Sequence, residues 1–239
     1  MNSKELRKNI LINSYKAGAC HLGSALSCVE ILLAIFQTKR NKDYFLFSKA
    51  SGVSAFYCLL GEMGVISKLN ILNFLKNHPL PDKHVPGVIH SVGSLGHGLN
   101  VAVGIAYADR SKNVYCLISD GEFNEGSTWE AILFAAHHKL NNLIVVCDFN
   151  NFQACGRTQD ILKLEDISKK MEAFNWSCNR CDGHDINYIN LYLTKHDFFP
   201  TMTICDTVKG KGVDFMEHKY EWHYRNLDNL LLQRALKQL

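Results

Sequence analysis

Short apolar runs alternate with helical patterns along most of this chain of 239 residues. Each run is too short for a helix and stops at turn-forming residues, which is typical of buried parallel strands. We expect strands at residues 44–48, 114–118, 143–148, 176–181 and 201–206. Since helical patterns separate these runs, the sequence predicts an α/β fold with a doubly wound, mostly parallel sheet and helices on both faces.

The segments between the runs predict the helices. They are expected at residues 4–17, 27–37, 52–63, 99–110 and 127–139, within 159–174, from 185 onward and at 227–239. Ser27 is expected to cap its helix, with Glu30 completing a capping box. Residues 77–98 hold three of the four prolines and four of the eleven histidines, which predicts a long, functional loop. The length fits a single domain over residues 1–239.

Composition and charge argue against several classes of protein. The net charge of +3 is small and the basic residues are dispersed, so we expect no nucleic-acid partner. The longest apolar runs, such as Leu143–Cys147, are far shorter than the roughly 20 residues of a membrane span, and we expect no membrane association. The first residues lead directly into an amphipathic segment, unlike a signal peptide. The nine cysteines are an odd number and several lie in apolar runs, which indicates buried thiols and a cytoplasmic protein.

Two polar side chains end two successive predicted strands. Asp120 follows the run at 114–118, and Asn150 follows the run at 143–148. Right-handed crossovers bring such strand ends to one edge of the sheet, where open α/β folds bind ligands. Carboxylate and amide oxygens suit a hard cation. The sequence therefore predicts Mg²⁺ there, with Ca²⁺ or Mn²⁺ as substitutes, and a phosphate group held by the cation.

The order of the motifs resembles a known family. Ser119–Glu130, followed by Asn150 and Asn151, is similar to the thiamine diphosphate fingerprint of transketolases, especially those split into two chains. Further similar segments run nearly end to end: His21–Gly23, Pro86–Val88, Gly93–Gly98, Asp182–Asp185, Thr207–Glu217 and Trp222-His223. The resemblance implies the thiamine diphosphate-binding fold and makes thiamine diphosphate the expected cofactor.

The resemblance also implies which residues hold the cofactor. Asp120, Asn150 and the backbone carbonyl of Phe152 would bind the metal. The loop Gly93–Gly98 would hold the diphosphate, because its glycines let the backbone approach and its amides point toward the start of a helix. The expected cofactor contacts are Ser51, Gly93, Ser94, Leu95, Gly121, Glu122 and Asn150.

Three residues are expected to be catalytic by resemblance. His21 and His223 would face the substrate and the reactive thiazolium, where imidazole can move protons near neutral pH. Glu125 would join a proton-sharing network between paired sites. Taken alone, each histidine also fits a surface or capping position, and Glu125 fits a helix N-terminus that favours acids. Lys209 and Lys211 fit phosphate contacts or an exposed flexible loop.

The chain departs from the family at several positions. Transketolases usually carry a histidine where this chain has Ser51, and serine cannot titrate. Ser119 replaces a glycine, His97 a glutamine, and Ala154 a larger aliphatic residue. These changes leave the donor and acceptor sugars open.

The resemblance covers only the first domain of a transketolase. We therefore expect the chain to be the N-terminal subunit of a two-chain enzyme, active only with a C-terminal subunit that carries the pyrimidine-binding domain, in a heterotetramer. The enzyme would move a two-carbon ketol unit from a ketose, or ketose phosphate, to an aldehyde acceptor. Two alternatives stay open. One is a thiamine enzyme that decarboxylates a 2-oxo acid, of the deoxyxylulose-phosphate synthase or dehydrogenase type. The other is a non-catalytic binding or regulatory subunit.

Overall fold

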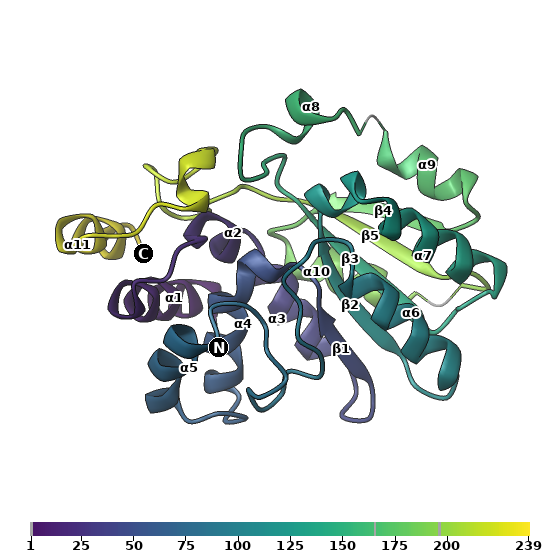
Figure 1. Cartoon of the computed structure of the whole chain (residues 1–239), viewed down its shortest axis with the longest axis horizontal. Helices are drawn as coiled ribbons and strands as arrows, with labels where there is room; N and C mark the ends of the chain where they lie inside the picture. The colour runs from purple at the N-terminus through teal and green to yellow at the C-terminus, as the bar shows by residue number, and fades with distance from the viewer. Residues whose placement is uncertain (1, 165, 196) are drawn as a thin grey trace.

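Five parallel strands form the centre of the structure, a computed structural model that describes residues 2–164, 166–195 and 197–239 (Figure 1). The strands are β1 (Tyr44–Phe47), β2 (Val114–Ser119), β3 (Leu143–Phe149), β4 (Ser177–Asp182) and β5 (Thr201–Asp206). Their order in the sheet is β1-β2-β3-β5-β4, and all neighbouring strands run parallel. The predicted parallel α/β fold is confirmed, because each expected strand lies within a residue or two of an observed one.

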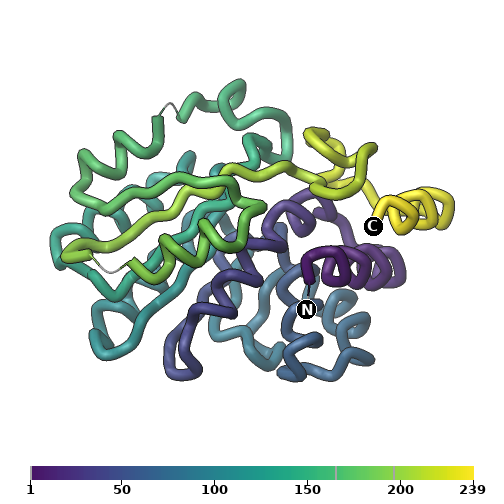
Figure 2. The backbone as a smooth tube through the Cα atoms, turned by 180° about the vertical axis from the view of Figure 1, so that it is seen from behind, coloured from purple at the N-terminus to yellow at the C-terminus, as the bar shows by residue number. Residues whose placement is uncertain are grey.

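Helices cover both faces of the sheet (Figures 1 and 2). Alternate residues of β2 point to opposite faces, as the pleat requires: Tyr115 and Leu117 join one apolar core, and Cys116 and Ile118 join the other. The first core is built with α1 (Ser3–Ala17), α2 (Leu22–Ser27), α3 (Val29–Thr38), α4 (Val53–Glu62), α5 (Ile71–Asn77), α10 (Ile186–Leu193) and α11 (Asn229–Gln238). The second core is built with α6 (Gly98–Ala108), α7 (Gly126–His137) and α9 (Ile167–Ala173).

The ends of the chain lie side by side. Helix α11 packs against α1, so the yellow C-terminal segment and the purple N-terminal helix are neighbours in both views (Figures 1 and 2). The segment between β5 and α11 includes the 3-10 turn Tyr220–His223, which contacts α2. This return path carries His223 back to the N-terminal part of the chain.

The predicted capping box at Ser27 is wrong. Ser27 is the last residue of α2, and its hydroxyl donates to Ser24 O at 3.0 Å and to Asp148 Oδ2 at 2.5 Å. Glu30 instead pairs with buried Arg7, with 2.6 Å between Oε2 and Nη2. A buried guanidinium holds this carboxylate more strongly than a backbone amide would.

Helix boundaries differ elsewhere in smaller ways. Helix α5 was not predicted, and the long loop that follows it runs from 78 to 97. The helical region expected up to residue 174 consists of α8 (Thr158–Ile161) and α9, and position 165 between them lies outside the described residues. The C-terminal helix begins at Asn229, two residues later than expected, because the Asp228 side chain caps it by accepting from Leu231 N at 2.8 Å.

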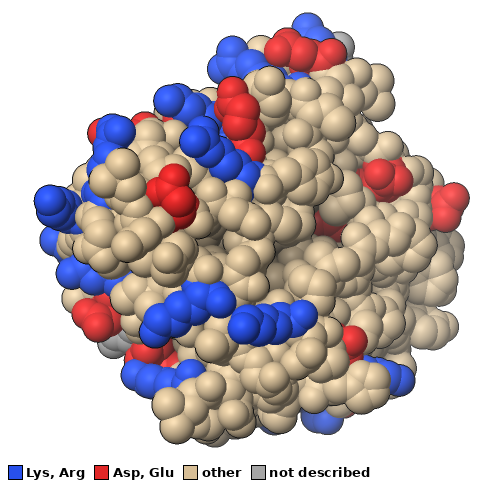
Figure 3. All heavy atoms as spheres, turned by 60° about the vertical axis from the view of Figure 1, so that its left-hand side comes forward, with Lys and Arg blue, Asp and Glu red and all other residues tan. Residues whose placement is uncertain are grey.

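The mixed distribution of charges on the surface and the burial of several thiols agree with what the composition indicated. Lys and Arg side chains are interspersed with Asp and Glu on the face shown in Figure 3, without a large field of one sign. Cys58, Cys116, Cys147 and Cys205 are buried free thiols. In the described part of the chain, no helix combines the length and the apolar character that crossing a membrane requires.

Candidate functional site

A cavity of about 230 Å³ lies at the carboxyl ends of β1, β2 and β3. Its walls come from these strand ends, from the 78–97 loop, from the start of α2 and from the turn that contains His223. The lining residues are His21, Ser24, Lys49, Ala50, Ser51, Leu80, Gly93, Leu95, Ser119, Asp120, Gly121, Asn150, Phe152, Gln153, Ala154, His223 and Tyr224. Most residues predicted for the site therefore meet at one place, although they are far apart in the sequence.

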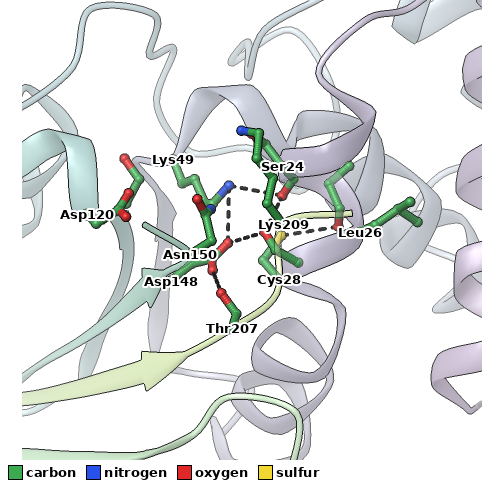
Figure 4. Close-up of polar contacts among 12 residues, drawn as sticks. Ser24, Leu26, Cys28, Lys49, Asp120, Asp148, Asn150, Thr207 and Lys209 are labelled. Atoms are coloured by element: carbon green, nitrogen blue, oxygen red, sulfur yellow. Dashed lines mark hydrogen bonds and ion pairs between the residues drawn. The ribbon is translucent and has the colours of Figure 1, made fainter. Parts of the chain in front are cut away.

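Asp120 and Asn150 follow neighbouring strands and both reach this cavity (Figure 4). Asp120 Oδ1 accepts from Gly121 N at 2.8 Å, and Oδ2 accepts from Asn151 N at 2.6 Å. Asn150 Oδ1 accepts from Phe152 N at 3.0 Å. These hydrogen bonds hold both side chains in the turns that follow β2 and β3. Both residues therefore lie at the same edge of the sheet, where the sequence placed them.

The chemistry of these donors fits a divalent cation. Burial raises the pKa of Asp120 to about 7, and the charge of nearby Asp148 adds to the rise. A cation would favour the ionised carboxylate at this position. In the described ranges no three His, Cys, Asp or Glu side chains gather into a possible metal site. A metal here would therefore rest on one carboxylate, the Asn150 amide and a carbonyl, which is a donor set that Mg²⁺ accepts when phosphate oxygens complete it.

The Gly93–Gly98 loop contributes to the wall of the cavity. Gly93 and Leu95 line the cavity, and helix α6 begins at Gly98 with its free amides at this end. Gly96 has φ +76°, and a Cβ there would lie 2.7 Å from Ser127 Oγ. Both its conformation and the close approach exclude larger residues. The loop thus brings backbone donors close to the Asp120–Asn150 edge, where an anion could be held.

His21 and His223 form a pair beside the cavity. Their rings meet edge to face with 4.7 Å between centroids, and His21 N donates to His223 O at 2.9 Å. Burial lowers the pKa of His21 to about 4 and that of His223 to about 3, and the charges of Lys49 and Lys209 add to both shifts. Both imidazoles are therefore neutral at physiological pH, and each can donate and accept one hydrogen bond.

Comparison with known proteins decides the family. Residues 10–237 match the family described as "Transketolase, thiamine diphosphate binding domain". The chain belongs to the transketolase family. The resemblance read from the sequence is confirmed, and the parallel α/β sheet is the thiamine diphosphate-binding fold.

Relatives of this transketolase-family chain include both short subunits and long chains. An apulose-4-phosphate transketolase subunit of Actinobacillus succinogenes is 36% identical over 98% of this chain and 92% of its own length. The 6-deoxy-6-sulfo-D-fructose transketolase subunit SqwG of Clostridium sp. (strain MSTE9) is 33% identical, covering 98% of this chain and 93% of that protein. The crystal structure of transketolase from Campylobacter jejuni superimposes with a TM-score of 0.92 at 27% identity, covering 100% of this chain. The chain spans only 43% of that structure but nearly the full length of the two subunits.

Glu122 does not line the cavity, so its predicted cofactor contact stays a prediction. It is fully buried outside the cavity lining, where Oε2 accepts from Ser119 N at 2.8 Å and Oε1 accepts from Ser48 Oγ. The Gly96 amide also donates to this carboxylate, whose pKa is raised by burial. In this transketolase-family fold, Glu122 braces the ends of β1 and β2 against the glycine loop, because each of these polar groups needs a partner once it is buried.

Three other predicted residues have different outcomes. Ser51 lines the cavity, and its cofactor contact stays a prediction. Ser94 is exposed on the loop and does not line the cavity, so its cofactor contact stays a prediction. Glu125 is the half-buried N-cap residue of α7 and also lies outside the lining. Its role between paired sites likewise stays a prediction.

The sequence reasoning missed an ion pair behind the cavity. Lys49 Nζ lies 3.2 Å from Asp148 Oδ2 and donates to Ser24 O at 2.9 Å, and both charged side chains are buried (Figure 4). Burial lowers the pKa of Lys49, but the charge of Asp148 outweighs this effect and the pKa is raised overall. Asp148 also accepts from Thr207 Oγ1. An acid inside the apolar run 143–148 was the one available signal, since such a residue needs a buried partner.

The sequence left two alternatives open for Lys209. The exposed flexible loop is wrong, because the side chain is fully buried, and the phosphate contact stays a prediction. Its Nζ donates to Ser24 Oγ at 3.2 Å and lies 3.4 Å from His223 Nδ1. Lys211, two residues further on, is half-buried. No local pattern in the sequence predicts that Lys209 is buried and Lys211 only half-buried.

Proposed function

We propose that this chain is the thiamine diphosphate-binding subunit of a two-chain transketolase. The complete enzyme moves a two-carbon ketol unit from a ketose, or ketose phosphate, to an aldehyde acceptor. One observation carries the proposal: Asp120, Asn150, the Gly93–Gly98 loop and the pair His21–His223 converge on a single cavity. The family match and the transketolase subunits of nearly equal length support it.

The cofactor would lie across the carboxyl edge of the sheet. Asp120, Asn150 and the Phe152 carbonyl hold Mg²⁺, for which Ca²⁺ or Mn²⁺ can substitute. The Gly93–Gly98 loop and Gly121 supply backbone donors to the diphosphate. Thiamine diphosphate supplies the carbanion chemistry when it is bound. The protein's part is to orient the cofactor and to manage protons at the substrate.

His21 and His223 perform that second task. Their low pKa values keep both rings neutral at working pH, so each offers one N–H donor and one acceptor nitrogen. Neutral imidazoles can hydrogen-bond the hydroxyl and carbonyl oxygens of a sugar and can accept a proton transiently. The pair therefore serves in substrate orientation and proton transfer.

A second polypeptide completes the site. The cavity rim includes partly exposed apolar residues, with Leu80 at 37%, Leu95 at 36% and Tyr224 at 66% exposure. A partner that carries a pyrimidine-binding domain would cover this rim and supply the glutamate that activates the cofactor. The two relatives of similar length are both named as transketolase subunits, which supports a hetero-oligomer, and we propose a heterotetramer.

The substrates are proposed to be specialised sugars. Ser51 stands at the cavity where a titrating histidine is usual, so one acid–base group is missing from the acceptor side. The variant Ser51→His should shift the preference among aldehyde acceptors. An unchanged acceptor profile would remove this link between Ser51 and specificity.

The test uses the chain together with a partner subunit of roughly 300 residues, the size of two further domains. With Mg²⁺, thiamine diphosphate, an aldehyde and a ketose ¹³C-labelled in its first two carbons, the complex should convert the aldehyde into a labelled ketose two carbons longer and release the donor as an aldehyde two carbons shorter. The variant Asp120→Asn should abolish transfer, and Asp160→Asn, an exposed acid on α8, should not. Release of CO₂ from a 2-oxo acid would favour the decarboxylase alternative. Failure to bind thiamine diphosphate would favour a non-catalytic subunit.

A further inference from the structure

Cys178 and Cys181 form a C-x-x-C sequence within strand β4. In a helix, residues three apart share a face, but in a strand they point to opposite sides of the sheet. The two apolar cores show this separation, because Cys178 packs against the second core and Cys181 against the first. The two cysteines of the motif therefore do not face each other, and a thiol partner for Cys181 has to come from another strand.

Cys205 of the neighbouring strand β5 lies directly beside Cys181. The two residues are partners in the register of the parallel pair, and both side chains lie on the face of the first core. Adjacent strands lie about 4.8 Å apart, which is within the range of about 4.4–6.8 Å between the Cα atoms of disulfide-bonded cysteines. Both thiols are free. The sheet thus holds two reduced cysteines at a separation that suits a disulfide.

The surroundings of the pair leave room for the sulfur atoms to meet. Strand β4 ends the sheet, with β5 as its strand neighbour (Figure 1). An edge strand carries one hydrogen-bonded ladder instead of two, so a small shift of β4 disturbs no second ladder. Gly183 packs over Cys205, where a Cβ would lie 2.9 Å from Cys205 Cβ. A glycine here keeps the space beside Cys205 free of a side chain.

The two thiols differ in exposure and in acidity. Cys205 is 0% exposed, whereas Cys181 is half-buried and reaches the surface. The Cys205 thiol lowers the pKa of Cys181, although burial and the charges of nearby aspartates oppose this effect. The contact with Cys181 and burial together raise the pKa of Cys205. The thiolate therefore forms first on Cys181, which is also the sulfur that a small oxidant can reach.

We propose that Cys181 and Cys205 are a redox-active pair that hydrogen peroxide converts into a disulfide between β4 and β5. The Cys181 thiolate attacks a peroxide oxygen, the O–O bond breaks, and a sulfenic acid forms. The departing hydroxide takes up the proton that Cys181 released and becomes water. Cys205 sulfur then attacks Cys181 sulfur, so the S–S bond forms and the S–O bond breaks. The second hydroxide takes the Cys205 proton, and two electrons have passed from the sulfurs to the peroxide.

The pair is separate from the cofactor cavity. Neither cysteine lines the cavity, and helix α10, which follows β4, packs against both strands of the pair. Asp148 of β3 is the register partner of Cys205, so the thiols adjoin the ion pair of Lys49 and Asp148 from the other side. Formation of the disulfide needs no cofactor, substrate or partner subunit. It can therefore be tested on the full chain alone and does not depend on the proposed ketol transfer.

The first experiment maps disulfides after mild oxidation of the folded chain with hydrogen peroxide. Remaining thiols are blocked with N-ethylmaleimide, and tryptic peptides are analysed by mass spectrometry without reduction. Trypsin cleaves after Arg180 and so separates Cys178 from Cys181. The link between Cys181 and Cys205 should be at least about tenfold more abundant than any link of Cys178, which lies on the other face. Its absence, or an equally abundant link of Cys178, would overturn the proposal.

A sample oxidised in urea tests whether the fold selects the pair. In the unfolded chain the closest cysteines in the sequence meet most often, because short loops close most readily. The link between Cys178 and Cys181 should then predominate over the link between Cys181 and Cys205. If the link to Cys205 predominates equally in urea, the sheet does not direct the pairing and the proposal fails.

Single variants separate the roles of the two sulfurs. In Cys205→Ser the sulfenic acid of Cys181 should persist and be trapped by dimedone, because the second thiol is missing. In Cys181→Ser the buried Cys205 should stay reduced at the same peroxide concentration. Cys178→Ser is the matched control from the same strand and should form the link as the wild type does. Oxidation of Cys205 in Cys181→Ser, or loss of the link in Cys178→Ser, would contradict the assignment. Far-UV circular dichroism confirms that each variant is folded before oxidation.

Discussion

Glu30 joins three elements that are far apart in the sequence, and its removal should weaken the whole fold. Its Oε1 and Oε2 accept from Arg7 of α1 at 2.7 and 2.6 Å, and Oε2 also accepts from His184 Nδ1 at 2.9 Å. His184 Nε2 in turn accepts from Val208 N at 2.9 Å, next to Lys209. The side chains of Arg7 and Glu30 are only 7% exposed. The network therefore links the N-terminal helix to the segment that carries Lys209.

The structure gives the size of this contribution. Burial by itself would raise the pKa of Glu30, but hydrogen bonds from His184 and Arg7 and the charge of Arg7 outweigh it and lower the pKa from 4.5 to about 2. One pH unit between the folded and unfolded pKa values is worth about 1.4 kcal/mol, so the difference corresponds to about 3 kcal/mol. Because the folded pKa is the lower one, this stability is present above about pH 4.5 and is lost as the pH falls toward 2.

Glu30→Gln tests this reasoning by urea unfolding of the full chain. At pH 7 the variant should lose about 3 kcal/mol of unfolding free energy, because buried Arg7 is left without its charge partner. Its stability should also fall less steeply than that of the wild type between pH 4.5 and 2. Glu172→Gln, an exposed acid on α9, is the control and should change stability by less than about 0.5 kcal/mol. A loss below about 1 kcal/mol at pH 7, or an unchanged acid slope, would refute the assignment.

Three further predictions concern the site. Gly96→Ala should weaken thiamine diphosphate binding at least about tenfold by calorimetry, because its φ of +76° and the nearby Ser127 exclude a methyl group, whereas Gly104→Ala, with open space around it, should not. Lys49→Met should cost about 3–5 kcal/mol in urea unfolding at pH 7, because Asp148 is left buried and unpaired; a loss under about 1 kcal/mol would contradict this pairing. Removing the divalent metal with a chelator should lower the melting temperature of the cofactor-loaded enzyme but not that of the chain alone, since only the bound state gains from the metal.

The fold was predictable because hydrophobic periodicity reports burial directly. The apolar runs at 114–118 and 143–148 are short, end at turn-forming residues and alternate with helical patterns, so a buried strand is the structure that they favour. The prediction failed where a distant side chain decided the local structure. Ser27 and Glu30 have the spacing of a capping box, but Asp148 and Arg7 take their hydrogen bonds instead.

The site was predictable in part for a related reason. Asp120 and Asn150 stand at strand ends, where topology alone places them at one edge, and Gly96 marks a backbone position that only glycine fills. Glu122 has the same kind of position, but its carboxylate turns inward to Ser48, which only the three-dimensional structure reveals. The difference between buried Lys209 and half-buried Lys211 depends on the path of the chain after β5, and no spacing rule records it.

The buried charges behind the cavity argue against the non-catalytic alternative. Asp120, Asp148, Lys49 and Lys209 are all nearly inaccessible at the carboxyl edge of the sheet, and each costs free energy to bury. Of these four groups only Lys49 and Asp148 lie within ion-pair distance of each other, so Asp120 and Lys209 have no ion-pair partner among the described residues. A binding scaffold would gain stability by replacing them with apolar residues, as buried ion pairs often permit. The proposed enzyme would use them, because charged groups that bind a cation or a phosphate act most strongly where water is excluded.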